Sequence, residues 1–337
     1  MIISVVFAQL QNLRILNLNK AANETLWPSQ SSMVPFPKLR VLQLYCFQDR
    51  NLGASLFNII HRYQNLESLT LGGFFVEKIW QHPEPGDDEE QHGVIRALPR
   101  LRELSLFRLY KLTHLFEDPA DVQLLRSLET LFIDGCSRLR TLLSSFVSFQ
   151  NLRDLAVLNC HGMTKLLASS VAKSLVRLVR MSITDCKRMK QVIVNNEGEA
   201  KGEIVFSELK IIDLRRLPSL ESFLGGGSHI QFPNLERVIL IECPEMRSFS
   251  FGTIITPKLD RIITKIIEYR HVDEYYLNGQ YFHHLEEAKQ IQQLQEANLD
   301  LNTSVRKLWE KDSSTTLQDV FITQVMVRTN PFSVSPY

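Results

Sequence analysis

Large apolar residues recur through the first 260 residues in one pattern, in which they stand three, three and two positions apart. One copy reads Phe36-Pro-Lys-Leu39-Arg-Val-Leu42-Gln-Leu44. The last two apolar residues, here Leu42 and Leu44, are two positions apart, so both side chains point to the same side of a short strand. The residues between and beside them are mostly polar and point to the opposite side. Each copy therefore predicts one short strand with a buried side and a solvent-facing side.

The pattern occurs in nine good copies and a tenth degenerate one. Their second apolar residues are Leu13, Leu39, Leu66, Leu101, Leu128, Leu152, Leu178, Leu209, Leu235 and Leu259. Most of the intervals are 24 to 27 residues long, which is the period of leucine-rich repeats. One copy cannot bury its apolar side alone, whereas stacked copies form a continuous core and a parallel sheet. The sequence predicts an α/β leucine-rich-repeat solenoid, a right-handed horseshoe with the parallel sheet on its concave face and short irregular or helical return limbs.

The repeat pattern divides the chain into an array and a C-terminal part, and we assign residues 1–264 to the array. Two intervals are longer, at 35 and 31 residues, because they contain the polar insertions 82–92 and 195–203. Residues 265–312 include a stretch rich in Glu, Gln, Lys, Ala and Leu, with apolar side chains at three- and four-residue steps, which predicts a C-terminal helical cap. Residues 313–337 hold one apolar run and an end that contains Pro and Ser, and we expect a poorly structured tail.

The charges of the chain balance, because Lys and Arg number 38 and Asp and Glu number 37, for a formal net charge of +1. A protein that binds nucleic acid through its phosphates shows a strong basic surplus, so we expect no nucleic-acid partner. No apolar run reaches the length of about 18 residues that a membrane span needs, so we expect no such span. The five cysteines are odd in number and form no Cys-x-x-Cys pair. This number and spacing of cysteines favours a reducing compartment, so we predict a cytoplasmic protein.

Residue clusters that carry chemistry are missing from the sequence. No Gly-x-x-x-x-Gly-Lys-Ser/Thr phosphate loop occurs. His283 and His284 are adjacent and face different directions, without the spacing of a metal-ligand set. Cys160 and His161 can be interpreted as a nucleophile and its base, but Cys160 stands in register with cysteines of other repeats, which favours a structural role. We therefore expect no catalytic residue, no metal and no cofactor.

The solvent-facing strand positions are where we expect protein binding. Nine parallel strands about 4.8 Å apart give a face roughly 40 Å long, enough for a standard protein–protein interface. Aromatic residues and arginine are enriched in such interfaces. The candidates at these positions are Tyr45, Phe107, Phe132, Asp134, Arg180, Asp213, Arg215 and Arg237. Trp27 and Trp80 in the return limbs are alternative anchors, although packing within their own repeats is the simpler interpretation.

Four repeats continue past the strand with a cysteine at the same position. The four are Cys136, Cys160, Cys186 and Cys243, each three residues after the last apolar residue of its strand. A buried thiol acts as a small apolar group with a weak S–H donor, which can reach a turn carbonyl inside the stack. We therefore predict structural turn cysteines, reduced and buried in a column.

These features together resemble the leucine-rich-repeat region of plant coiled-coil nucleotide-binding disease resistance proteins, which are intracellular immune receptors. The resemblance covers roughly residues 7–311. Besides the cysteine turns it includes Glu24-Thr-Leu-Trp27, Glu77-Lys-Ile-Trp80 and Leu299-Asp-Leu-Asn-Thr-Ser-Val305. Because the phosphate loop is missing, the sequence predicts the repeat region of such a receptor without its nucleotide-binding domain.

The resemblance implies a non-enzymatic sensor for pathogen effectors, or for host proteins that effectors modify, which also restrains the receptor's nucleotide switch. The implied partners are the effector or guarded host protein and the nucleotide-binding domain of the parent receptor. The alternative is the substrate-recognition repeats of a ubiquitin-ligase adaptor of the F-box type, whose repeats also carry a cysteine after the strand. Those adaptors usually place a regular amphipathic helix in the return limb, whereas one limb here reads Arg138-Leu-Arg-Thr-Leu-Leu143.

Overall fold

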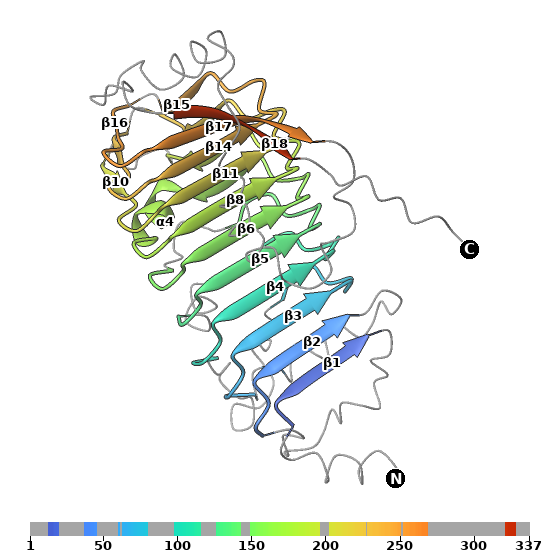
Figure 1. The fold of residues 1–337 in the computed structure, drawn as a ribbon. Helices are drawn as coiled ribbons and strands as arrows, with labels where there is room; N and C mark the ends of the chain where they lie inside the picture. The colour runs from blue at the N-terminus through green and yellow to red at the C-terminus, as the bar shows by residue number, and fades with distance from the viewer. Residues whose placement is uncertain are drawn as a thin grey trace, which may run out of the picture.

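The chain folds into a stack of coils, and one strand of each coil lies in a single long sheet (Figure 1). The computed structural model describes residues 13–19, 37–45, 60, 63–79, 98–115, 126–142, 149–195, 202–226, 228–250, 252–268 and 321–327. Several residues of the sequence analysis lie outside these ranges, namely Trp27, Trp80, the insertion 82–92, residues 269–312 of the expected cap, His283 and His284, as does the fifth cysteine, Cys46.

Eleven strands form the main sheet, in the order β1-β2-β3-β4-β5-β6-β8-β11-β14-β17-β18. They are β1 (Ile15–Asn19), β2 (Val41–Tyr45), β3 (Ser68–Gly72), β4 (Glu103–Phe107), β5 (Thr130–Asp134), β6 (Asp154–Leu158), β8 (Arg180–Thr184), β11 (Ile211–Arg215), β14 (Arg237–Ile241), β17 (Arg261–Glu268) and β18 (Phe321–Val327). Every neighbouring pair is parallel. Leu69 pairs with Leu42 on one side and with Leu104 on the other, which confirms the strands and the register expected from the repeat pattern.

The return limbs of the C-terminal coils contain strands as well. A four-stranded parallel sheet, ordered β15-β12-β9-β7, and a three-stranded one, ordered β10-β13-β16, lie there. Their strands are β7 (Lys165–Ala168), β9 (Gln191–Val194), β10 (Ile204–Val205), β12 (Ser222–Leu224), β13 (Ile230–Gln231), β15 (Ser248–Ser250) and β16 (Ile254–Ile255). One short helix, α4 (Ser169–Ser174), follows β7.

The expectation of irregular or helical limbs is therefore wrong for these coils. The reason lies in the limb sequences, which carry adjacent apolar residues such as Val192-Ile193 and Phe223-Leu224. All four of these side chains are fully buried. Because β-branched and aromatic side chains fit a pleated, packed surface, such short limbs form strands.

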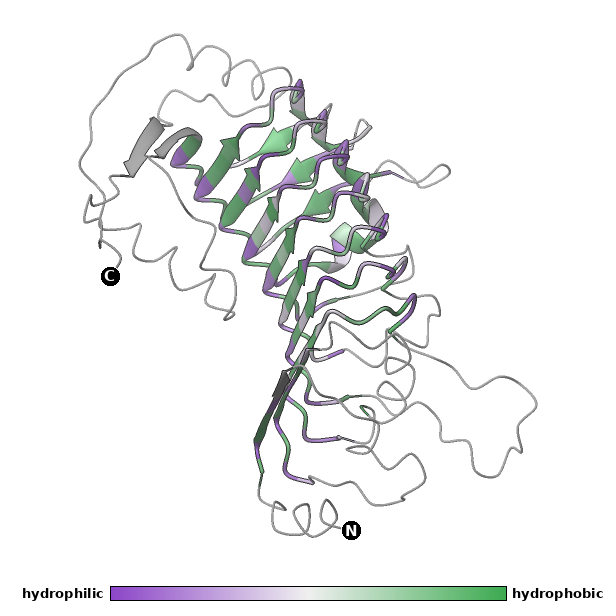
Figure 2. Ribbon diagram, turned by 90° about the vertical axis from the view of Figure 1, so that its right-hand side faces the viewer, coloured by the Kyte–Doolittle hydropathy of each residue, from purple (hydrophilic) through white to green (hydrophobic). Residues whose placement is uncertain are grey.

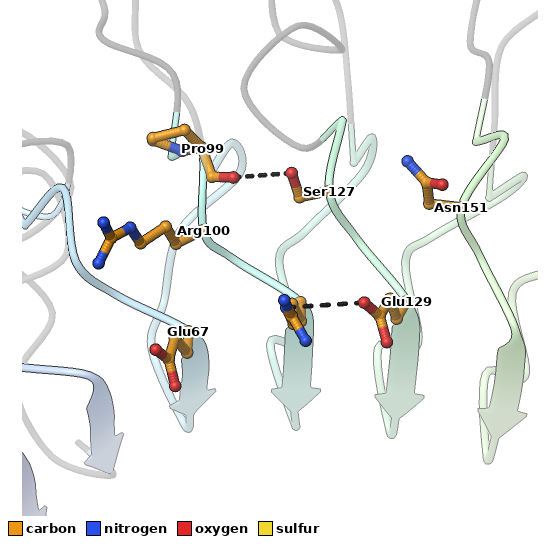
Figure 3. Close-up of a pocket in the computed structure, with 7 residues that line it drawn as sticks. Glu67, Pro99, Arg100, Ser127, Glu129 and Asn151 are labelled. Atoms are coloured by element: carbon orange, nitrogen blue, oxygen red, sulfur yellow. Dashed lines mark hydrogen bonds and ion pairs between the residues drawn. The ribbon is translucent and has the colours of Figure 1, made fainter.

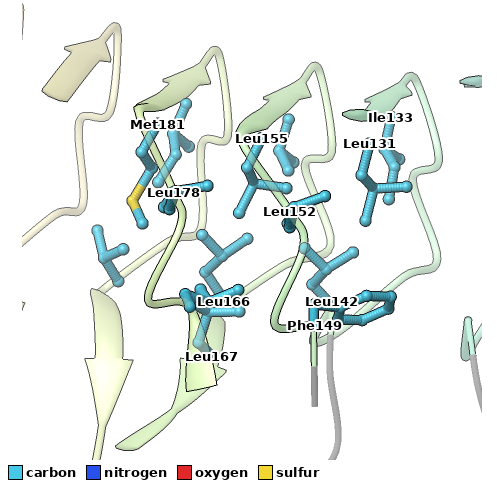
Figure 4. Close-up of a cluster of buried hydrophobic side chains, with 14 of the residues drawn as sticks. Leu131, Ile133, Leu142, Phe149, Leu152, Leu155, Leu166, Leu167, Leu178 and Met181 are labelled. Carbon is cyan, nitrogen blue, oxygen red and sulfur yellow. The ribbon is translucent and has the colours of Figure 1, made fainter. Parts of the chain in front are cut away.

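The core fills the space between the main sheet and the return limbs (Figure 4). Leu155 of β6 and Met181 of β8 point from the main sheet toward the limb that holds Leu166 and Leu167, and Leu131 of β5 points toward the limb that holds Leu142. All six side chains are buried. Replacing a leucine in such a position by alanine costs about 2–5 kcal/mol, so the repeated leucines account for the stability of the stack.

Phenylalanine rings fill the core of the C-terminal coils. Phe206 and Phe232 are stacked with ring centroids 5.5 Å apart, and Phe223 and Phe249 are stacked at 4.6 Å. All four rings are fully buried. Within each pair the two rings occupy equivalent places in successive coils, so each pair joins one coil to the next.

The C-terminal end of the sheet departs from expectation. β17 runs to Glu268, beyond the array boundary expected at residue 264 and into the segment expected to be helical. β18 pairs with it in parallel, with Phe321 beside Arg261. β18 lies within the segment 313–337, for which a poorly structured tail was expected. Five of its seven residues are β-branched or aromatic, and such a run pairs readily with the open edge of β17.

Candidate functional site

The candidate site is the face of the main sheet that points away from the core. In the five-residue strands the second and fourth residues are directed into the core, and the first, third and fifth residues form this other face, which we call the concave face. Because the strands are parallel and in register, these positions are stacked in three rows along the solenoid. The predicted site residues at these positions are Tyr45, Phe107, Phe132, Asp134, Arg180, Asp213, Arg215 and Arg237.

Three aromatic residues form a connected group toward the N-terminal end of the concave face. The ring centroids of Tyr45 and Phe107 lie 6.4 Å apart, and those of Phe107 and Phe132 lie 5.1 Å apart. Gly72 of β3 lies between Tyr45 and Phe107 in the row of fifth residues. A Cβ atom on Gly72 would lie 2.5 Å from Cδ1 of Tyr45, so glycine lets the tyrosine ring lie across β3. Sequence reasoning missed Gly72, although a glycine among larger residues in one row is a visible signal.

The aromatic group continues into a small apolar cluster on the same face. Phe132, Ala156 and Leu158 are buried in it, apart from the main core, and Phe107 packs against them. Phe132 is 7% exposed, so its ring serves packing more than contact with a partner. Phe107 and Tyr45 are half-buried, and burial raises the pKa of Tyr45 above its ordinary value. These two rings therefore present most of the accessible aromatic surface.

Asp134 is held within the sheet and is not presented to solvent. Its side chain is buried, and its Oδ1 accepts a hydrogen bond of 2.7 Å from Nδ2 of Asn159. Burial raises the pKa of Asp134, while the hydrogen bond from Asn159 and the charge of Arg108 oppose this rise. The structure thus gives Asp134 a partner inside the fold, which the sequence did not reveal.

Three arginines and an aspartate form a second group toward the C-terminal end of the face. Nε of Arg215 donates to Oδ1 of Asp213 over 2.7 Å, and Asp213 is 1% exposed. Burial raises the pKa of Asp213, and the charge and hydrogen bond of Arg215 oppose the rise. Burial also raises the pKa of Asp154, and the nearby positive charge of Arg180 opposes this rise. Arg237 is half-buried one strand further on.

Buried hydrogen-bond acceptors lie beside this ion pair. Oδ2 of Asp213, Oγ of Ser182 and Oγ1 of Thr184 are buried and have no hydrogen-bond partner among the described residues. Ser182 is in register with Asp213, and Thr184 with Arg215. Because unpaired buried polar atoms are costly, this spot favours a donor from water or from a bound partner. Neither Ser182 nor Thr184 stood out in the sequence.

β6 separates the two groups, so the predicted residues do not form one cluster. Its outward residues are Asp154, Ala156 and Leu158, of which the last two belong to the aromatic side. The aromatic group spans β2 to β5, and the arginine group spans β8 to β14. The concave face therefore offers two neighbouring subsites of different chemistry.

The turn cysteines stack beside the ends of the main strands. Cys136, Cys160 and Cys186 follow the neighbouring strands β5, β6 and β8, and all three are fully buried. Leu217 takes the equivalent place after β11, and Cys243 after β14 is only half-buried. The expected column is thus interrupted, and its last member departs from the expected burial.

The thiols of Cys186 and Cys243 each donate a hydrogen bond to the backbone carbonyl two residues earlier. The distance from Sγ to the carbonyl oxygen is 3.5 Å for both Cys186 and Cys243. Contact with the thiol of Cys160, together with burial, raises the pKa of Cys136 and Cys186 well above the ordinary value. Burial raises the pKa of Cys243 to about 11. These thiols are therefore protonated at neutral pH, which is the form that donates to a carbonyl and resists oxidation.

A polar depression of about 400 Å³ lies at the turns that precede the strands (Figure 3). Its lining residues are Glu67, Pro99, Arg100, Arg102, Ser127, Glu129 and Asn151. Nε of Arg102 lies 3.6 Å from Oε1 of Glu129, and Oγ of Ser127 donates to the carbonyl oxygen of Pro99 over 2.7 Å. These side chains are paired across neighbouring coils, so we assign them a structural role.

No cluster of three or more His, Cys, Asp or Glu side chains suited to a metal ion occurs in the part of the chain that the structure describes. Within that part, no helix has both the length and the apolar character needed to cross a bilayer.

Comparison with known proteins agrees with this architecture. The family described as plant disease resistance protein RPS2-like, leucine-rich repeats, matches residues 9–147 and 145–262. The "Probable disease resistance protein At5g47260" of Arabidopsis thaliana is 28% identical over 166 residues, which are 46% of this chain and 17% of that relative. The chain thus spans only a small part of the relative's length. Because the family match extends over most of the coils, the chain belongs to the leucine-rich-repeat family of RPS2-like plant disease resistance proteins.

Proposed function

We propose that the chain is a non-enzymatic recognition domain of a plant immune receptor, which binds pathogen effectors, or host proteins that effectors modify, through its concave face. One observation carries the proposal, namely that the connected rings of Tyr45, Phe107 and Phe132 share a face with the paired Arg215 and Asp213. Aromatic and arginine side chains are the usual anchors of protein interfaces. Membership of a disease resistance family supports the immune role.

The two subsites fit different parts of a protein partner. The half-buried rings of Tyr45 and Phe107 suit an apolar side chain, since rigid rings lose little entropy on binding. The half-buried Arg180 and Arg237 suit carboxylate or carbonyl groups, and the unpaired Oδ2 of Asp213 suits a donor. A partner that contacts both subsites presents an apolar side chain beside polar groups.

The second proposed role is restraint of the parent receptor through contact with its nucleotide-binding domain, in the cytoplasm. The proposed restraint and the proposed cytoplasmic location are both supported by membership of the disease resistance family. The ubiquitin-ligase alternative is not favoured, because the family match and the Arabidopsis relative are both disease resistance proteins. The strands found in the C-terminal return limbs also differ from the regular helices of those adaptors.

The test is a titration of a captured partner with single-residue variants of the 337-residue chain. Phe107→Ala and Arg180→Ala remove one anchor from each subsite, and Tyr110→Ala and Arg177→Ala are matched controls on exposed turns. Truncating an interface anchor costs about 2 kcal/mol, so we expect about 30-fold weaker binding for each concave variant. The controls should bind as the wild type does. Unchanged affinity in both folded concave variants would refute the concave-face proposal.

A further inference from the structure

The first residues of four consecutive return limbs carry a strong excess of positive charge. These limbs follow β4, β5, β6 and β8, and the segments in question are residues 108–115, 135–142, 159–168 and 185–190. Together they contain eight Lys and Arg residues and one carboxylate, Asp185. The whole chain, in contrast, has 38 basic and 37 acidic residues. Polar residues gather at the turns on both sides of the main sheet, where they are purple in Figure 2.

Two of the charges in these limbs are compensated by ion pairs. Oδ2 of Asp185 lies 2.6 Å from Nη2 of Arg216, so the single carboxylate already has a basic partner. Nζ of Lys190 lies 3.6 Å from Oε1 of Glu221. Neither pair involves the other basic residues of the limbs.

Six basic side chains are left exposed and form no ion pair with any residue in the described ranges. Arg108 is set apart from them because its charge acts on the buried Asp134. We call these six the basic limb surface: Lys111, Arg138, Arg140, Lys165, Lys187 and Arg188.

The turns beneath this surface are alike and fixed. After each strand the turn closes with a hydrogen bond of 3.0 or 3.1 Å between the N–H and the carbonyl oxygen three residues earlier. These bonds join Leu112 to Leu109, Leu139 to Cys136, Met163 to Cys160 and Met189 to Cys186. The carbon and sulfur side chains of all eight residues are fully buried. The exposed basic residues between them are therefore carried on a rigid support, which lowers the entropy cost of binding.

Arg138 and Arg188 occupy the same turn position in coils that are two steps apart, roughly 10 Å at the usual strand spacing. Gly162 has that position in the coil between them. A Cβ atom on Gly162 would lie 2.1 Å from the carbonyl oxygen of Ser137, so the close approach of the turns excludes a side chain there. The equivalent turn position between the exposed Arg138 and Arg188 therefore carries no side chain.

The repeat does not require this charge. The next limbs, which follow β11 and β14, hold Arg216 and Arg247 but also Glu221, Glu242 and Glu245. Like charges on neighbouring turns repel, and mixed charges at the same positions are compatible with the same turn. A local excess that weakens the free protein is therefore better explained by an anionic partner.

We propose that the basic limb surface binds an acidic segment of a partner protein, at a place separate from the concave face. The guanidinium groups of Arg138, Arg140 and Arg188 match carboxylates in paired hydrogen bonds. The surface extends over four limbs, about 14 Å along the solenoid, with Glu77 before it and Glu245 beyond it. RNA, which carries charge along its whole length, would run into those carboxylates, whereas an acidic run in a protein segment can end with the surface.

The test measures binding of a fluorescein-labelled ten-residue peptide of alternating Glu and Gly to the 337-residue chain by fluorescence anisotropy. The matched peptide has Gln in place of Glu. We expect the Glu peptide to bind at least tenfold more tightly than the Gln peptide. The variant Arg138→Gln/Arg140→Gln/Arg188→Gln should weaken it at least tenfold, and raising the salt from about 50 to about 300 mM should weaken it further. The control Arg40→Gln/Arg102→Gln/Arg153→Gln removes the same charge at the opposite turns and should change the affinity less than twofold.

The proposal fails if the Glu peptide binds no better than the Gln peptide, or if the control variant loses as much affinity as the test variant. It also fails if oligouridine RNA binds more tightly than the Glu peptide and the triple variant no longer binds that RNA, because the partner would then be a nucleic acid. The melting temperature of each variant shows whether it is folded. If the triple variant is not folded, Arg188→Gln alone should weaken the Glu peptide about threefold, and an unchanged affinity would overturn the proposal.

Discussion

The N-terminal and C-terminal halves of the concave face use the same strand positions in different ways. Between β2 and β5 the contacts from coil to coil are made by the rings of Tyr45, Phe107 and Phe132. Between β8 and β14 charged side chains take these positions, and the almost fully buried Asp213 accepts a hydrogen bond from Arg215 of the same strand. A position on the strand therefore does not set the role of its side chain. The residues beside it decide whether it packs, pairs or faces a partner.

The two halves also differ in how conditions affect them. Ring packing is stabilised by burial of apolar surface, which is insensitive to protonation. The stability of the charged half depends on whether Asp213 is ionised, because burial raises its pKa. The turn cysteines also differ along the solenoid, with three fully buried thiols after β5, β6 and β8 and one half-buried thiol after β14. Each of these differences can be tested by a single substitution.

The largest effect is expected for Phe132→Ala, which removes the ring that joins Phe107 to Ala156 and Leu158. Because Phe132 is 7% exposed, the change leaves a cavity and should lower the free energy of unfolding by about 3 kcal/mol. Urea denaturation followed by circular dichroism measures it. Tyr110→Ala is the control, since this ring is 45% exposed and its loss should cost under about 0.5 kcal/mol. Equal losses in the two variants would contradict the packing role.

The strands and their register could be predicted from the sequence because the leucine pattern has a fixed spacing, and a slip by one residue would turn Leu42 and Leu44 to the outside. The candidate positions on the concave face followed from the same alternation. What could not be predicted were contacts between residues about 25 positions apart, such as Asn159 with Asp134. The limb strands were missed because a run of two apolar residues such as Val192-Ile193 is too short to have a period.

A smaller effect, about 2 kcal/mol, is expected for Asp213→Ala in the charged half. The change removes the acceptor of the Arg215 Nε bond and leaves a guanidinium group that is 21% exposed in the folded state. Breaking a buried pair by removing one partner costs more than the pair contributes, but the exposed fraction lets Arg215 recover some hydration. Asp213→Asn is the matched control, because its amide oxygen still accepts the bond, and should cost under about 1 kcal/mol. Urea denaturation at pH 7 measures both costs. Equal free energies of unfolding for Asp213→Ala and Asp213→Asn would refute the role of the Arg215 bond.

The wild type and Asp213→Asn should also differ in how their free energy of unfolding depends on pH. Burial raises the folded-state pKa of Asp213 above the ordinary value of 3.8, so the folded state binds the proton first as the pH falls. Stability linked to Asp213 is therefore lower above the folded pKa and is gained as the pH falls through it toward 3.8. The free energy of unfolding of the wild type, relative to Asp213→Asn, should rise as the pH falls from 7 to about 4. A difference that stays constant or falls would contradict the raised pKa.

Gly72→Ala tests how the aromatic half is connected, with an expected cost of about 1 kcal/mol. The new Cβ atom would lie 2.5 Å from Cδ1 of Tyr45, so the tyrosine ring must turn away from Phe107. The ring-proton NMR signals of both residues should shift, while those of Phe132 should change less. The matched variant Ser105→Ala, on the neighbouring strand of the same face, should leave the Tyr45 signals in place. Unmoved Tyr45 signals in the glycine variant would mean that the ring does not depend on Gly72.

The smallest effect is the difference in cost between two turn cysteines, Cys160 after β6 and Cys243 after β14. Cys160 is fully buried beside two other cysteines, so a serine there places a more polar hydroxyl group among groups that cannot hydrate it. Cys160→Ser should cost about 1 kcal/mol or slightly more. Cys243 is half-buried, and a serine hydroxyl there can bind water, so Cys243→Ser should cost roughly half as much. Urea denaturation of the two variants under reducing conditions measures the difference. If Cys243→Ser were the more destabilised of the two, burial would not be what distinguishes the thiols, and the turn after β14 would depend on its S–H donor to the strand carbonyl instead.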